Sequence, residues 1–294
     1  MSRCRSFFIP FGILSLFFLS LPASAAGNNE KIKVFVSIVP QKYFVEKIGG
    51  KYVEPVPMVQ LGDNPHNYEP KAQQMAELSR AKAYFAIGVP FEGAWLPKLA
   101  AVNPKMAVIH TETNIVKMPM ADYAPSDGKH ADEALDPHIW LSPRLVKIQA
   151  DHILQGLIAA FPQHTDEFKQ NHRNFITELE NLDRDLTELF KQTPGKRIMV
   201  FHPTWGYFAR DYGLIQIPIE VGGKEPKAAQ VWKLIAEAKK QKIDMIFAQP
   251  EFSAKSAQFI ADEIDATLIF AGALNEDWEK NLRTIAAQFK AALR

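Results

Sequence analysis

The sequence predicts an α/β protein with two lobes, each built on a mainly parallel sheet flanked by helices, joined by one long rigid helix. Three observations predict this fold. Short β-rich runs alternate with amphipathic stretches, one segment recurs in both halves, and a long apolar stripe lies between the halves. The 294 residues suffice for one large or two modest domains.

Eight runs have the length and the β-branched or aromatic content of strands. Four lie in the first half, at 33–39, 53–59, 83–88 and 106–110, and four in the second, at 197–201, 215–221, 244–248 and 267–270. Each is followed by helical spacing or by turn residues, which is the pattern of βα units. We therefore expect a mainly parallel sheet in each half.

The two halves also repeat one segment. The letters EPKAQQMAEL begin at Glu69, and EPKAAQVWKL begins at Glu225, an offset of 156 residues. Since proline in the first turn favours a helix start, E-P-K-A alone could be a shared helix cap. Because a helix and then an apolar strand follow in both halves, we interpret them as related lobes.

Between the halves, residues 165–192 carry a stripe at alternating steps of four and three residues. The stripe consists of Phe168, His172, Phe175, Leu179, Leu182, Leu186 and Leu189. Asp166 and Glu167 suit the first turn of a helix, and Pro194-Gly195 ends it. A helix of about 28 residues is about 42 Å long and stiffer than a Gly/Ser linker, so it limits hinge bending.

Residues 1–26 have the features of a secretory signal peptide. Arg3 and Arg5 precede an apolar stretch, and Ala23-Ser24-Ala25 supplies small residues for cleavage. The stretch is about 15 residues long, shorter than the ~20 of a membrane-spanning helix. We therefore expect an exported, periplasmic protein with a lobe at 27–164, the joining helix at 165–192 and a second lobe at 193–294.

Charge and cysteine content exclude several classes of protein. Lys and Arg number 34 against 33 Asp and Glu, which provides no basic stripe for nucleic acid. The one cysteine, Cys4, lies in the predicted leader. A metal site in the mature chain must therefore be built from imidazole and oxygen ligands.

Three of the eight histidines share a context. His66, His138 and His202 each adjoin a proline, which restricts the backbone, and each has an aromatic residue nearby. His66 and His202 follow predicted strands, at the sheet edge where open α/β folds bind ligands. The remaining histidines we interpret as ordinary polar residues (His110, His152, His164 and His172) or, in the polar loop 117–136, as at most a weak accessory ligand (His130).

The ligand type narrows the choice of metal. Imidazole suits zinc, copper, nickel or iron, whereas manganese and calcium prefer more oxygen ligands. Three neutral imidazoles with one carboxylate or water match the four-coordinate preference of zinc.

At these residues the chain resembles the periplasmic metal-binding proteins of zinc/manganese ABC importers. The resemblance is carried by P-H-x-Y-E-P at 65–70, D-P-H-I-W-L-S-P at 136–143 and F-H-x-x-W-x-Y-F at 201–208. It implies two lobes bridged by a rigid helix, with His66, His138 and His202 as ligands of one metal ion in the cleft. It also implies delivery of that ion to a membrane permease driven by ATPase subunits. Histidine at position 202 is the zinc-type arrangement, since manganese-type relatives tend to carry a carboxylate there.

Two features depart from the family pattern. The family commonly supplies a fourth ligand, an aspartate, where this chain has Ala271 or Gly272. Glu251, Glu276, Asp277 or water could take its place. The His-rich loop of zinc-type members is also replaced by a shorter stretch with His130 alone.

Other functions remain open from the residues alone. A manganese or iron protein of the same type, a secreted three-histidine zinc hydrolase, and an adhesin or binder of an organic solute would share much of this pattern. The sequence has no H-E-x-x-H motif. We therefore expect a monomeric carrier without enzymatic activity, which undergoes a modest change in one lobe or loop on metal uptake.

Overall fold

The computed structural model describes Met1 and residues 31–120, 135–220, 224–253 and 255–293. The segment Lys31–Arg294 forms one compact unit. The predicted signal peptide, apart from Met1, and His130 lie outside the described residues. Within the described parts of the chain, none of the helices combines the length and the apolar content needed to cross a membrane.

The first sheet contains four parallel strands in the order β2-β1-β3-β4. Their bounds are β1 (Ile32–Val36), β2 (Val53–Pro57), β3 (Ala83–Ala86) and β4 (Ala107–His110). All four predicted strands of the first half are thus confirmed. The first run was predicted to continue to residue 39, but the strand ends at Val36. The helix α1 (Val39–Gly49) already begins at Val39, with Pro40 in its first turn.

The second sheet repeats this arrangement in the order β6-β5-β7-β8, again all parallel. Its strands are β5 (Arg197–Val200), β6 (Ile215–Pro218), β7 (Met245–Ala248) and β8 (Thr267–Phe270). Both sheets therefore place their first strand between their second and third, which confirms two mainly parallel sheets of the same topology.

The repeated segment has the same local structure in both lobes. It begins α2 (Ala72–Leu78) in the first lobe and α7 (Ala228–Gln241) in the second. In each helix, the side chain of a glutamine in the first turn accepts a hydrogen bond from the backbone of the lysine just before the helix. The Lys71 N–H donates to Gln74 Oε1 over 2.9 Å, and the Lys227 N–H donates to Gln230 Oε1 over 2.7 Å. The resemblance between the halves thus includes this glutamine cap as well as the E-P-K-A tetrapeptide.

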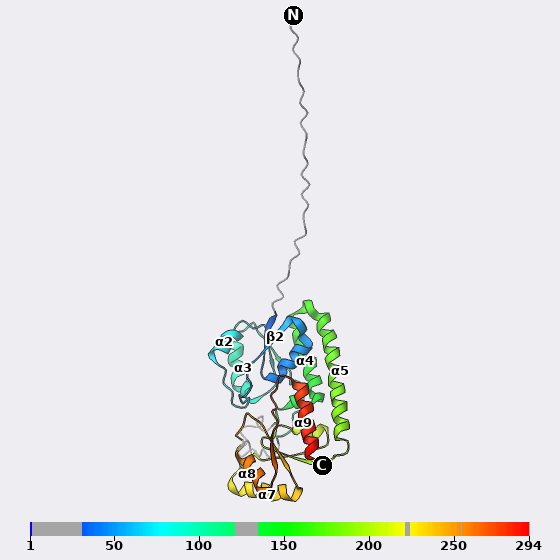
Figure 1. Ribbon diagram of the computed structural model, residues 1–294. Coiled ribbons are helices and arrows are strands. Elements are labelled where there is room, and N and C mark those ends of the chain that lie inside the picture. Colours follow the sequence, from blue (N-terminus) through cyan, green and yellow to red (C-terminus); the bar gives the residue numbers. More distant parts are fainter. Residues whose placement is uncertain (2–30, 121–134, 221–223, 254, 294) are drawn as a thin grey trace. The chain divides into compact units, whose positions relative to one another are not determined.

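Further helices flank the two sheets (Figure 1). They are α3 (Pro90–Val102), α4 (Pro143–Ala160), α6 (Gly206–Asp211) and α8 (Lys255–Glu263), with short 3₁₀ turns at Gly50–Tyr52, Ile139–Leu141 and Pro162–His164.

The predicted joining helix is α5 (Thr165–Phe190), which ends two residues before the expected boundary at 192. Most of its apolar stripe is buried, and the helix packs against α1 and α4 of the first lobe. At its other end Phe190 contacts Phe208 and Tyr212 of the second lobe, with ring centroids 5.6 and 6.0 Å apart. One uninterrupted helix therefore contacts both lobes (Figure 1).

A second helix, α9 (Trp278–Ala292), also contacts both lobes, which the sequence did not predict. Its first residue, Trp278, lies edge-on to Phe44 of α1, with ring centroids 5.0 Å apart. Near its end, Phe289 lies edge-on to Phe247 of β7 and to Trp205, at 4.7 and 5.2 Å. Buried aromatic side chains thus fix the two lobes together along two helices.

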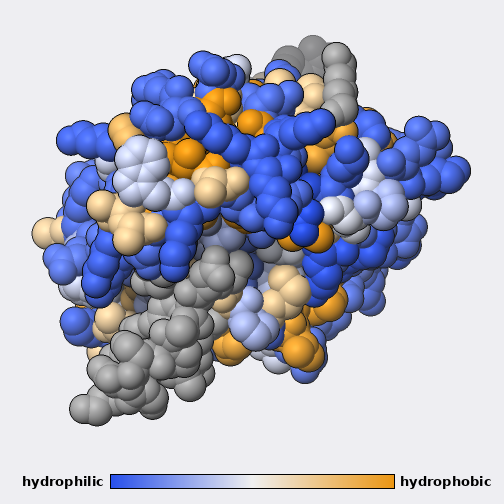
Figure 2. Space-filling model, turned by 90° about the horizontal axis from the view of Figure 1, so that it is seen from below, coloured by the Kyte–Doolittle hydropathy of each residue, from blue (hydrophilic) through white to orange (hydrophobic). Residues whose placement is uncertain are grey.

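The two faces of the second sheet are buried in different cores. Val200 and Phe247 face the large core that also contains α5 and α9. Phe201 and Ile246 face a smaller core under α7 and α8. This alternation is the period of two expected for strands buried on both faces. Seen from below in Figure 2, the outer surface at the α7 end of the molecule is mostly hydrophilic with scattered apolar side chains.

Candidate metal centre

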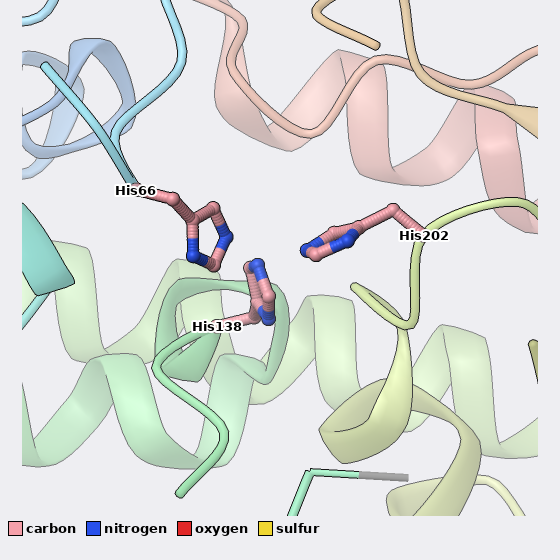
Figure 3. Close-up of side chains that lie close together, drawn as sticks. All are labelled: His66, His138 and His202. Atoms are coloured by element: carbon pink, nitrogen blue, oxygen red, sulfur yellow. The ribbon is translucent and has the colours of Figure 1, made fainter. Parts of the chain in front are cut away.

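The three proline-flanked histidines lie together in the structure (Figure 3). One ring nitrogen from each of His66, His138 and His202 lies within 4.8 Å of the others. The ring centroids are 5.5 Å apart for His66 and His138, 4.9 Å for His66 and His202, and 5.2 Å for His138 and His202. Two of these side chains come from the first lobe and one from the second, so both lobes contribute to the cluster.

His66 lies in the loop between β2 and α2. Its backbone N–H donates to Asn64 Oδ1 over 2.9 Å, which holds a tight turn before the histidine. Two residues later Tyr68 is buried edge-on against Phe91, with centroids 5.5 Å apart, and fixes the far end of the loop. Among the described residues, the His66 ring forms no hydrogen bond, so its orientation depends on packing alone.

His138 is held by the aspartate of its own motif. Asp136 Oδ1 accepts from the His138 backbone N–H over 2.9 Å and from the ring Nδ1 over 2.7 Å. Both side chains are at most 3% exposed. With Nδ1 bound to the carboxylate, Nε2 is the nitrogen that remains for a ligand.

His202 has a carboxylate partner from another strand. Its Nδ1 donates to Glu220 Oε2 over 2.6 Å, and the two side chains are 4% and 8% exposed. The opposite ring nitrogen, Nε2, is buried and has no hydrogen-bond partner among the described residues. A buried, unpaired imidazole nitrogen is costly unless it binds something.

The end of β7 fixes the backbone around His202. Gln249 accepts from the His202 N–H over 3.3 Å, and its amide donates to the His202 carbonyl and the Thr204 hydroxyl over 3.1 and 2.8 Å. Phe252 stacks on the His202 ring, with centroids 4.4 Å apart and planes 19° from parallel. The ring is therefore held on its edge and on its face.

Gly206 and Tyr207, in the motif at 201–208, support Asp136, which begins the motif at 136–143. A Cβ at position 206 would lie 2.6 Å from Asp136 Oδ2, so only glycine leaves room for that carboxylate. The Tyr207 hydroxyl donates to the Asp136 carbonyl over 2.8 Å. Residues of the second lobe thus position the aspartate that orients His138.

Burial keeps two of these histidines neutral. Desolvation lowers the pKa of His66 and His138 well below the ordinary 6.5, and the neighbouring histidines lower it further. Burial also raises the pKa of Asp136 to about 7, opposed by the hydrogen bond from His138 and the charge of His202. Neutral imidazole is the form that binds metal ions.

The other histidines are not part of this cluster. His110 is half exposed and pairs with Glu112 over 2.8 Å, and His172 pairs with Asp151 over 2.8 Å. The His152 ring contacts the Thr113 carbonyl over 2.9 Å, and His164 stacks on Tyr52, with centroids 3.8 Å apart. All four have local surface partners, as the sequence analysis expected of ordinary polar residues.

Of the carboxylates considered for the fourth ligand, only Glu251 lies near the cluster. It lines a pocket of about 20 Å³ together with His66, His138 and Trp140. Glu276 is exposed and pairs with Lys42 over 3.3 Å, and Asp277 is exposed at the start of α9. Ala271 is buried, and no carboxylate stands at that position.

The donor set fits zinc. Around a tetrahedral zinc ion with Zn–N distances of about 2.0–2.1 Å, ligand nitrogens lie about 3.3–3.4 Å apart. The three histidine nitrogens are already within 4.8 Å of one another, so small side-chain movements suffice. The unpaired Nε2 of His202 and the two carboxylates behind His138 and His202 are what a zinc site requires.

Sequence reasoning missed Glu220, Gln249 and Phe252 as supports of the site. Glu220 lies two residues after the end of β6 and within the run predicted as a strand at 215–221, and an acidic side chain near the end of that apolar run was the available signal. Asp136 stood inside a quoted motif, but its role as partner of His138 was not predicted.

Two parallel-sheet lobes, helices packed against both, and a cluster of three histidines between them define a solute-binding protein of the metal-ion type. The family model of the zinc-uptake complex component A, periplasmic (ZnuA), matches residues 34–292, and the chain belongs to this family. The family is described as periplasmic.

Solved structures and curated proteins agree with this assignment. A crystal structure of ZnuA is 42% identical, covers 90% of this chain and 100% of its own, and superposes with a TM-score of 0.84. A zinc-bound ZnuA lacking residues 138–173 is also 42% identical over 90% of this chain and 98% of its own, with a TM-score of 0.83. The zinc-binding lipoprotein AdcA of Streptococcus pneumoniae is 28% identical over 259 residues, which cover 85% of this chain and 51% of AdcA. The chain thus spans about half the length of AdcA.

Proposed function

We propose that this protein binds one zinc ion through His66, His138 and His202 and delivers it to an ABC permease for uptake. The observation that carries the proposal is the convergence of three imidazole nitrogens within 4.8 Å. The zinc-bound ZnuA structure at 42% identity supports zinc as the cargo.

The donor set also favours zinc over manganese and iron. Manganese prefers more oxygen ligands, and two of the nearby carboxylates, Asp136 and Glu220, are engaged at the Nδ1 atoms of histidines. They thus act as partners of the ligands, which leaves imidazole as the main ligand type.

Zinc content of the purified protein tests the site. We expect one zinc per chain in the wild type and loss of zinc from His66→Ala, His138→Ala and His202→Ala. His152→Ala, which removes a histidine with a surface partner, is the matched control and retains zinc. Unchanged zinc in all three site variants would refute the proposed ligands.

We further propose that the chain is a carrier without enzymatic activity. The sequence contains no H-E-x-x-H motif, the pattern of two histidines and a glutamate found in many zinc peptidases. The similar ZnuA and AdcA proteins are named for zinc uptake and zinc binding and not for a reaction. Assays of the zinc-loaded protein on generic ester and β-lactam substrates test this, and appreciable turnover lost in His202→Ala would contradict it.

The proposed pathway also includes export and a membrane partner. We propose that residues 1–26 are removed on export to the periplasm, leaving lobes at 27–164 and 193–294 joined by the helix at 165–192, as a monomer. The family description, an uptake-complex component, supports the permease as partner. N-terminal sequencing of the exported protein tests the cleavage site, and a chain that still begins at Met1 would contradict it.

A further inference from the structure

We propose that Glu251 supplies the fourth metal ligand of the three-histidine site, an inference that rests on the proposed metal-binding function. Glu251 would take the place of the aspartate that the family commonly carries where this chain has Ala271 or Gly272. Glu251 lines the small pocket that His66 and His138 also line, on the side of the second lobe.

The segment that carries Glu251 is anchored to the site on both sides of this residue. Gln249 hydrogen-bonds the backbone of His202 and the hydroxyl of Thr204. Phe252 stacks on the His202 ring. Because both neighbours are fixed against the same ligand loop, the Glu251 backbone has a defined place beside the cluster.

The Glu251 carboxylate has no side-chain partner among the described residues. It forms no ion pair and no hydrogen bond with another side chain, although the residue is half-buried. Desolvation raises its pKa, opposed by a hydrogen bond from its own backbone N–H and by the charge of His202. A half-buried carboxylate without a cation gains from a divalent ion nearby.

In the loop at the usual fourth-ligand position, the backbone oxygens of Gly272 and Ala273 already accept hydrogen bonds. The Ala273 carbonyl accepts from the Trp140 indole N–H over 3.0 Å, and the Gly272 carbonyl accepts from the Asn281 amide over 2.8 Å. These two backbone oxygens therefore stabilise the His138 loop and α9. Neither replaces the missing carboxylate.

Ligation by Glu251 involves a movement of its side chain toward the histidines. In the metal-free chain the tight cluster consists, among the described residues, of the three histidine nitrogens alone. The Glu251 carboxylate lies outside it while lining the adjoining pocket. A glutamate side chain has three rotatable bonds, and the pocket of about 20 Å³ that Glu251 lines accommodates one small group, such as a carboxylate oxygen.

The test compares zinc and cobalt binding by the wild-type chain and by Glu251→Gln, which keeps the shape and removes the charge. Zinc affinity is measured by competition with a chromophoric chelator, and the visible absorption of bound cobalt reports the ligand set. We expect the zinc Kd to rise at least about tenfold in Glu251→Gln, with a changed cobalt spectrum, because outer partners of metal ligands already contribute 10–100-fold. Glu251→Asp recovers part of the loss, since it restores a carboxylate.

Glu276→Gln and Asp277→Asn are matched controls and rival candidates, and both are expected to bind zinc as the wild type does. A wild-type chain that binds no zinc would overturn the proposed function itself. A wild type that binds zinc while Glu251→Gln shows the same Kd and the same cobalt spectrum would overturn the assignment of Glu251 alone. Equal thermal stability of the metal-free wild type and Glu251→Gln excludes misfolding as the cause of a loss.

Discussion

Replacing Glu220 by glutamine is expected to weaken zinc binding although the residue does not touch the metal. The carboxylate accepts from His202 Nδ1 over 2.6 Å inside the protein, where both side chains are less than a tenth exposed. The negative charge makes the imidazole a better electron donor and compensates part of the charge of the ion. Glutamine keeps an oxygen acceptor and loses that charge.

The expected magnitude follows from the type of hydrogen bond. A bond to a charged partner contributes about 1.5–3 kcal/mol and a bond between neutral groups about 0.5–1.5 kcal/mol. The difference is about 1–1.5 kcal/mol, which raises the zinc Kd about five- to tenfold. Glu220→Ala removes the bond entirely and is expected to cost up to about 100-fold.

Zinc competition against a chelator of known affinity measures both variants. Glu46→Gln, at an exposed glutamate of α1, is the matched control and should leave the Kd unchanged. If Glu220→Gln and Glu220→Ala both bound zinc like the wild type, the carboxylate would have no role in tuning His202. Equal losses in the two variants would show that the charge, and not the hydrogen bond, accounts for the whole effect.

Two further predictions concern pH. Zinc affinity should change little above pH 7 and fall below it, because Asp136, with a pKa of about 7, takes up a proton first, and His66 and His138, with pKa values below 6.5, follow at lower pH; competition titrations from pH 5 to 9 test this, and a steady fall from pH 9 to 7 would contradict it. The second concerns Glu92, which is buried and accepts from the backbone N–H groups of Ile87 and Gly88 over 2.9 and 2.8 Å. Burial raises its pKa from 4.5 to about 7, so the folded state keeps a proton that the unfolded chain releases. The contribution of Glu92 to the free energy of unfolding is fully present below pH 4.5. As the pH rises from 4.5 through about 7, the free energy of unfolding falls by about 3 kcal/mol. Urea unfolding should therefore show Glu92→Gln gaining stability relative to the wild type between pH 5 and 8, and a pH-independent difference would refute the assignment.

Local patterns in the sequence predicted the elements of the fold well. All eight predicted strands and the long helix are present in the described part of the chain, because strand runs and helical stripes are encoded by neighbouring residues. The bridging role of α9 was not found. It depends on contacts of Trp278 with Phe44 and of Phe289 with Phe247, which join residues far apart in the chain.

The residues of the site also fall into those that short sequence motifs predict and those that depend on how distant segments pack. The three histidines were predicted because each stands in a short motif beside proline. The supports of His202 were missed because they follow from the strand order β6-β5-β7, which the sequence does not state. In that order the ends of three neighbouring strands place Glu220, His202 and Gln249 side by side.

The arrangement of ligands and helices indicates how a bound ion is exchanged. Separating the lobes would break the buried contacts of Phe190 with Phe208 and of Trp278 with Phe44, so α5 and α9 oppose a wide hinge opening. His138 and His202 are each fixed by a buried carboxylate. The His66 ring has no such partner among the described residues, although the backbone of its loop is fixed by the Asn64 side chain and by the Phe91 N–H, which donates to the Pro65 carbonyl over 3.3 Å. Of the three rings, that of His66 is therefore the one that can turn away from the cluster without breaking a side-chain hydrogen bond and with the two lobes kept in place.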